Sequence, residues 1–198
     1  PVRDPFFMMI RRSLNTFMNA FTSSDWTAYP FASQNRKDFN NLLSVYLDSV
    51  FFARLDPLDF AQEGHRLEFE TPEDSMSDLT FKGIVYNEMK GAMSSINSTL
   101  WQTVTKYLYP TSTYHNNSGG DPTAIPDLSY DQFKAFYDIH YHPSNSIFIT
   151  FGDITAREHQ ANFQDLALHR FERLNCHIAV TDEHRYRKPQ HVEEHYAF

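Results

Sequence analysis

Apolar residues recur at the three- and four-residue spacing of an amphipathic helix along much of the chain, which predicts several helices that each bury one face. The clearest stripe of apolar residues runs from Phe39 to Leu55. Weaker stripes predict further helices at residues 6–18, 57–63, 81–109 with a break near 95–98, 130–141 and 155–174. Two of these helices also have local end signals: Asp56-Pro57 favours a start and Gly64 an end, while Ser129 with Gln132 forms a capping box.

Other segments follow the pattern of strands. Residues 19–31 are short aromatic and β-favouring runs on either side of Ser24-Asp25, which predicts a β-hairpin. Residues 65–70 alternate between apolar and charged side chains, and residues 146–152 have a continuous apolar centre, so each predicts a strand. Helices and strands therefore alternate without an internal repeat. This order predicts an α/β or α+β fold in which helices pack on a mixed, largely antiparallel sheet.

Composition narrows the class of protein. The 198 residues are 41% apolar and 16% aromatic, enough for a sizeable core. The formal charge of −8 includes no dense run of Lys and Arg, so we expect no nucleic-acid partner. No apolar run approaches the roughly 20 residues that cross a bilayer, and we expect no membrane partner. The single Cys176 excludes an internal disulfide.

The two ends of the chain suggest an excerpt. The sequence opens at Pro1 without an initiator Met, runs at once into an apolar stretch, and stops at the aromatic Phe198 without a closing element. We therefore expect a fragment of a longer protein, with part of its chemistry outside this sequence.

The segment HVEEH, His191–His195, matches H-x-x-E-H, in which two histidines hold zinc and the glutamate activates a water. Here the pattern follows Pro189 in a polar, aperiodic stretch, and only three residues come after it. A helix that would place both histidines on one face has little room to form. We interpret this match as a coincidence in a chain that is rich in His and Glu.

Several other residues of the chain are candidates for chemistry. His140 and His142 are only two apart, no G-x-S-x-G pattern occurs, and Cys176 has no nucleophile context. Glu88 differs, because it lies in a predicted helix among apolar neighbours that would draw its carboxylate toward the core. Such a carboxylate needs a partner, which is either a metal ion or a lysine such as Lys82 or Lys90. Spacing alone favours the lysine and leaves both open.

Several longer segments resemble the M16 (insulinase or pitrilysin) zinc metallopeptidases, and most closely their presequence protease branch. The resemblance covers roughly residues 1–155 and includes these segments: FMNAFTSSDWTAYPFASQN, NLLSVYLDSVFF, LDFAQEGHRLEFE, FKGIVYNEMKGAMSS, LWQTVTKYLYPTSTYHNNSGGDP and FYDIHYHPSN. In this family two histidines of an H-x-x-E-H helix and a downstream glutamate hold one Zn²⁺. The resemblance implies that Glu88, in VYNEMKG, is the metal ligand that this chain supplies to the zinc cofactor.

The resemblance also implies the rest of the site. Both histidine ligands and the general base would precede Pro1, so we expect no catalytic residue within this chain. The family binds a peptide as an added strand, and the matching substrate-binding residues are Asn19, Ala20, Phe21 and Thr22; Phe21 is equally compatible with plain core packing. Glu63 would support the metal site as an outer neighbour, or simply solvate a helix end.

The function expected from this resemblance is that of a zinc metalloendopeptidase that degrades short unstructured peptides. Residues 1–175 would belong to its N-terminal peptidase domain and 176–198 to a polar connecting segment. Its partners would be unfolded peptide substrates and the remaining domains of the same polypeptide. The alternative is a non-catalytic homologue that serves as a structural or peptide-binding subunit. We expect a bacterial cytoplasmic location first, and a mitochondrial or other organelle matrix as the alternative.

Overall fold

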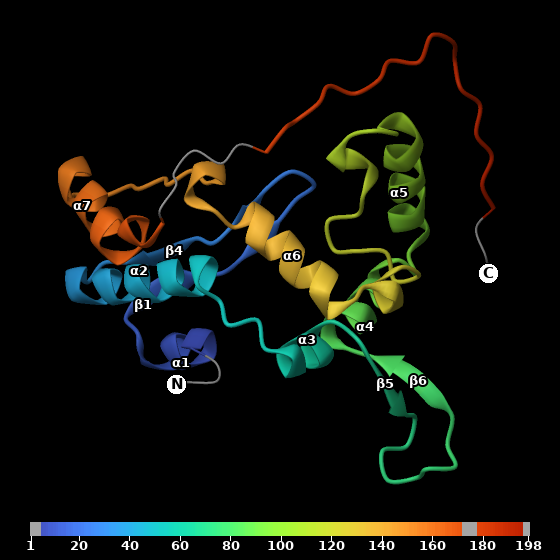
Figure 1. Ribbon diagram of the computed structural model, residues 1–198, viewed down its shortest axis with the longest axis horizontal. Helices are drawn as coiled ribbons and strands as arrows, with labels where there is room; N and C mark the ends of the chain where they lie inside the picture. The colour runs from blue at the N-terminus through green and yellow to red at the C-terminus, as the bar shows by residue number, and fades with distance from the viewer. Residues whose placement is uncertain (1–4, 172–177, 196–198) are drawn as a thin grey trace. The chain divides into compact units, whose positions relative to one another are not determined.

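A computed structural model describes residues 5–171 and 178–195 and shows an α+β fold (Figure 1). The α-helices of the described residues are α1 Pro5–Arg12, α2 Arg36–Phe51, α3 Pro57–Glu63, α4 Ile84–Ala92, α5 Ile96–Leu108, α6 Tyr130–His140 and α7 Ala156–Leu166. Short 3-10 helices lie at η1 Thr113–His115, η2 Ile125–Asp127, η3 Pro143–Asn145 and η4 Leu168–Arg170. No helix in these two described ranges is long and apolar enough to cross a membrane.

The strands form pairs. The three pairs of the described residues are β1 Asn15–Met18 with β4 Phe31–Ser33, β2 Phe21–Thr22 with β3 Thr27–Ala28, and β5 Arg66–Phe69 with β6 Leu79–Lys82. The β1–β4 and β5–β6 pairs are antiparallel. The expected α+β class is therefore confirmed, although the described strands form three two-stranded sheets where we expected one larger sheet.

The described chain divides into two compact units. The first unit consists of residues 5–21, 27–54, 135–171 and 178–179, and the second of residues 22–26, 55–134 and 180–195. The core of the first unit is built on one face of α2, and its buried apolar residues are Leu42, Leu43, Tyr46, Leu47, Phe51 and Ala167. Phe148, Phe163 and Phe171 pack against this core. The long apolar stripe that predicted α2 is therefore the face that the first unit buries.

The second unit leaves its apolar faces open. None of the buried apolar residues in the described chain belongs to it. On α5 the apolar stripe is exposed at Ile96, Leu100, Val104 and Leu108. Leu67 pairs with Phe81 across β5 and β6, so the two side chains share one face of the hairpin, and both are exposed. The described residues of the second unit thus have the patterns of helices and strands, but none of their apolar side chains is fully buried.

The first predicted helix is too long. α1 ends at Arg12, and the residues that we expected to continue it form strand β1. Asp38 fixes this end, because its carboxylate accepts hydrogen bonds from Ser13 Oγ at 2.9 Å and from the Leu14 backbone N–H at 3.1 Å. The prediction failed because β1 depends on pairing with β4, and such a non-local contact overrides a helical pattern of apolar residues.

The strand predicted at residues 146–152 is wrong for a related reason. In the described residues this segment pairs with no strand. Phe148 packs against the first unit's core, whereas Ile147, Ile149 and Phe151 are 88%, 89% and 102% exposed. The continuous apolar run that predicted a strand is present here, but a strand forms only where another strand accepts its backbone hydrogen bonds.

Other predictions are confirmed. Helix α3 starts at Pro57 behind the capping residue Asp56 and ends before Gly64. The capping box of α6 forms, with the Ser129 N–H bonded to Gln132 Oε1 at 2.8 Å and the Gln132 N–H to Ser129 Oγ at 3.2 Å. The 81–109 region contains α4 and α5, although its first two residues complete strand β6. Cys176 lies outside the described residues.

Candidate active-site elements

Glu88 lies in the middle of α4 and is exposed to solvent. Its expected partial burial is not observed, because α4 buries none of its residues and Ile84 and Val85 are themselves exposed. Neither lysine pairs with it within the described residues. Lys82 Nζ donates to the Phe69 carbonyl at 2.9 Å, and Lys90, two positions along the helix, faces another direction. The Glu88 carboxylate therefore has no protein partner in the described chain.

The start of α4 is fixed by a close backbone contact. Gly83, the residue before the helix, is buried, and a Cβ atom at this position would collide with the carbonyl oxygen of Gly64. The Tyr86 N–H also approaches the Gly64 carbonyl oxygen at 3.4 Å. Glycine at 83 lets the end of β6 pass against the end of α3, and this passage sets the position of Glu88 in the second unit.

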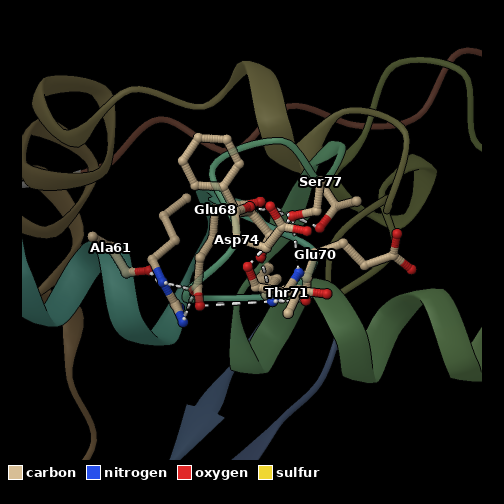
Figure 2. Close-up of polar contacts among 10 residues, drawn as sticks. Ala61, Glu68, Glu70, Thr71, Asp74 and Ser77 are labelled. Atoms are coloured by element: carbon tan, nitrogen blue, oxygen red, sulfur yellow. Dashed lines mark hydrogen bonds and ion pairs between the residues drawn. The ribbon is translucent and has the colours of Figure 1, made fainter.

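The β5–β6 hairpin holds the strand that leads into α4. On its polar face, Glu68 accepts hydrogen bonds from Arg66 Nε at 2.9 Å, and Lys82 Nζ lies 3.6 Å from the other Glu68 oxygen. Figure 2 shows this network and its continuation into the loop, where Ser77 Oγ donates to the Asp74 carbonyl at 2.8 Å. Arg66 also donates to the Ala61 carbonyl of α3 at 3.4 Å. Side-chain bonds thus connect α3, β5 and β6, the three elements that precede α4.

Glu63 is the last residue of α3 and is exposed. Its side chain accepts a hydrogen bond from Gln62 Nε2 at 3.2 Å. Helices α3 and α4 pack beside each other in the second unit, yet no hydrogen bond joins Glu63 to Glu88 in the described residues. The supporting role of Glu63 stays a prediction.

The candidate substrate-binding residues Asn19, Ala20, Phe21 and Thr22 are all exposed. Phe21 is 44% exposed and stacks on Phe17 with ring centroids 6.2 Å apart, so it is not a core residue in this structure. Strand β2 pairs with β3 only, among the described residues, which leaves its other edge without a strand. An exposed strand edge is the feature that an added peptide strand requires.

The HVEEH segment does not form a metal-binding helix. Residues 191–195 are irregular and exposed, so the four-residue spacing of His191 and His195 does not place them on one helical face. Glu194 instead accepts a hydrogen bond from the Tyr107 hydroxyl at 2.6 Å. No group of three His, Cys, Asp or Glu side chains in the described chain is arranged to hold a metal ion.

For the full-length zinc peptidase that the resemblance implies, replacing His191 by Ala is therefore expected to leave zinc content and peptide cleavage unchanged. His191 is exposed on an irregular segment and has no neighbouring ligand. Metal analysis of the purified variant, together with its rate of peptide cleavage, checks this expectation. A loss of zinc in the His191→Ala protein would restore the motif as a metal site.

Comparison with known proteins gives the relatives of this chain, although no family model matches it. "Presequence protease, mitochondrial" of Xenopus tropicalis is 53% identical over 190 residues, which are 96% of this chain and 18% of that protein. The protein of the same name from Mus musculus is 50% identical over 190 residues, with the same two shares. The Schizosaccharomyces pombe protein is 51% identical over 152 residues, or 77% of this chain and 15% of its own length.

Identity of about 50% along nearly the whole chain identifies its class: the sequence corresponds to one segment of the longer proteins that are named presequence protease. The chain belongs to the presequence protease family, as its resemblance to that branch of the M16 metallopeptidases predicted. It spans less than a fifth of the length of these relatives. Their names all include the word mitochondrial, which gives no support to the bacterial cytoplasm that we expected first.

Proposed function

We propose that the parent protein of this chain is a zinc-dependent endopeptidase of the mitochondrial matrix that degrades short unstructured peptides. The observation that carries this proposal is the identity of 50–53% to proteins named mitochondrial presequence protease over 96% of the chain. We further propose that Glu88 supplies one zinc ligand, with the other ligands and the general base outside this chain. Zinc in such a site polarises the scissile carbonyl and lowers the pKa of a bound water.

The structure supports a ligand role for Glu88 in two ways. A carboxylate oxygen is a ligand that zinc accepts, and the Glu88 carboxylate is exposed on a helix without a competing cation in the described residues. The backbone contact at Gly83 and the polar network of the β5–β6 hairpin hold that helix in place. A single carboxylate does not bind zinc tightly, because affinity depends on several ligands in one rigid arrangement. The remaining ligands must come from other parts of the parent protein.

The role proposed for Asn19, Ala20, Phe21 and Thr22 is to bind substrate along the open edge of β2. Backbone pairing with an added strand makes little demand on the sequence of the peptide, which suits a peptidase with many unfolded substrates. The exposure of all four residues supports this role. The open apolar faces of α5 and of the β5–β6 hairpin would be covered by other domains of the same polypeptide, since the chain spans only 18% of its relatives.

The test of this function uses the full-length protein and a fluorogenic, unstructured peptide of about 20 residues, long enough to form an added strand. We expect cleavage that stops when a zinc chelator is added and returns with Zn²⁺, and no cleavage of a stably folded protein of similar length. Binding of the peptide without any cleavage would instead identify a non-catalytic, peptide-binding homologue. Cleavage that persists after the metal has been removed would contradict the proposed zinc dependence.

A further inference from the structure

A carboxylate near the C-terminal end of the described chain is bound by a distant turn of the second unit. Glu183 lies in an irregular segment, residues 180–195, that we call the strap. Its side chain accepts hydrogen bonds from Thr111 Oγ1 at 2.6 Å, from the Thr111 N–H at 3.2 Å and from the Ser112 N–H at 2.9 Å. The backbone N–H of His184 donates to the same carboxylate at 2.8 Å. One side chain of the strap thus satisfies several donors of the turn that follows α5.

Two further hydrogen bonds fasten the strap to α5. The Tyr186 hydroxyl donates to the Tyr107 carbonyl at 2.8 Å, and the Tyr107 hydroxyl donates to Glu194 at 2.6 Å. The strap is therefore bonded to α5 and to the turn that follows α5 near both of its ends. Although its sequence is polar and aperiodic, it is attached to the surface of the unit at specific places.

The turn that Glu183 binds continues directly into η1, and η1 holds the tip of the β2–β3 hairpin. Thr113 Oγ1 donates to the Ser24 carbonyl at 2.8 Å, and the Tyr114 hydroxyl donates to Asp25 Oδ2 at 2.6 Å. Both tip residues belong to the same compact unit as η1 and the strap. They are part of the turn that follows strand β2 at Thr22. A continuous series of contacts therefore runs from the strap through η1 to the hairpin that carries β2.

These contacts matter because β2 and β3 have little stability of their own. Each strand has two residues, and an isolated two-stranded hairpin is at best marginally stable in water. The hairpin has its own bonds from the Ser23 N–H to the Trp26 carbonyl at 2.8 Å and from the Asn19 N–H to the Pro30 carbonyl at 3.1 Å. The bonds of the tip to Thr113 and Tyr114 add an anchor from outside the hairpin. An anchor is effective only if η1 is itself ordered, and the Glu183 carboxylate bonds the two residues immediately before η1.

The charge of Glu183 is suited to a permanent contact at neutral pH. Desolvation alone would raise the pKa of this carboxyl, but the hydrogen bonds from Thr111 and Ser112 outweigh it and lower the pKa to about 2. A carboxyl whose pKa is lowered on folding contributes stability above its unfolded pKa, near 4.5, and loses it as the pH falls toward 2. The carboxyl is therefore ionised at neutral pH and can accept these hydrogen bonds.

We propose that Glu183 is a positioning residue for the substrate strand: it orders the turn at 111–112, so that η1 holds the Ser24–Asp25 tip and fixes strand β2. This inference rests on the proposed binding of peptides along β2. Glu183 does not touch the substrate in this scheme, and no described contact joins it to Glu88. Its removal should therefore weaken substrate binding and leave the chemical step intact.

The test compares Glu183→Gln with Glu193→Gln in the full-length protein. Glu193 is an exposed carboxylate of the same strap and forms no hydrogen bond in the described residues. We expect Glu183→Gln to increase hydrogen exchange in residues 19–28 and 111–114, and to raise KM for the unstructured peptide roughly threefold to tenfold with kcat unchanged. Glu193→Gln should match the unchanged protein in hydrogen exchange, in KM and in kcat.

A second variant tests the contact at the hairpin tip separately from the contacts of Glu183. Tyr114→Phe removes the bond to Asp25 but leaves the Glu183 contacts in place, so we expect faster exchange at 19–28 without a change at 111–112. Faster exchange at 111–114 but not at 19–28 in Glu183→Gln would overturn the positioning role, as would a fall in kcat at constant KM. If the exchange changes appear but a bound peptide gives residues 19–22 no protection, the strap orders the hairpin and it is the proposed substrate strand that fails.

Discussion

Replacing Glu88 by Gln in the full-length protein is expected to reduce its zinc content and to lower peptidase activity by on the order of 100-fold or more. Loss of an outer-shell partner of a metal ligand typically costs about 10-fold to 100-fold, and loss of a ligand itself should cost at least as much. Glutamine keeps the size of the side chain and its helical position, so the change removes the charge and one ligand oxygen. Metal analysis and the rate of peptide cleavage measure the two effects.

Two other glutamates provide the comparison. Glu73 is an exposed carboxylate in the β5–β6 loop, and Glu73→Gln should leave both zinc and activity unchanged. Glu63→Gln tests the supporting role of Glu63. Its peptidase activity should lie between the activities of Glu88→Gln and Glu73→Gln, lowered by about 10-fold to 100-fold if Glu63 is a neighbour of the metal site. Zinc content that is the same in Glu88→Gln and in the unchanged protein would rule out Glu88 as a ligand, whatever happens to the activity.

The sequence predicted best those elements whose signals are local. Helix α2 was found because its apolar stripe is the face that the first unit buries, and α3 because Asp56-Pro57 and Gly64 mark its two ends. The strands were less predictable, because a strand depends on a partner that is distant in the sequence. Residues 15–18 have the apolar pattern of a helix but pair with β4, and residues 146–152 have the pattern of a strand but pair with none in the described chain.

The residues of the candidate site also differ in how far the sequence alone could predict their contacts. Spacing alone favoured an ion pair for Glu88, and only the resemblance to a family of zinc peptidases singled it out as a ligand. The structure then showed an exposed carboxylate without a lysine partner among the described residues, which spacing could not predict. Glu183 had no signal in the sequence, because a carboxylate that binds backbone N–H groups some 70 residues away leaves no local pattern. Contacts of this kind are determined by the tertiary fold.

Replacing Leu42 by Ala is expected to destabilise the first unit by about 2–5 kcal/mol, the usual cost of a cavity at a fully buried leucine. Leu42 is 0% exposed on α2, the helix that supplies most of the buried residues of that unit. Alanine has a higher helix propensity than leucine, so the loss is one of packing and not of helix formation. Native-state hydrogen exchange of the α2 amides in the full-length protein gives the change in the free energy of opening.

Leu58→Ala is the matched control, since the same side chain on α3 is 79% exposed and its truncation should change stability by no more than about 0.5 kcal/mol. The comparison also tests how the two units differ. The first unit buries its own apolar face on α2, so its stability should depend on Leu42 whatever surrounds it. The second unit has no buried apolar residue among those described, so its stability should depend little on a single exposed side chain such as Leu58. Equal effects of Leu42→Ala and Leu58→Ala would show that the core of the first unit is not where its stability originates.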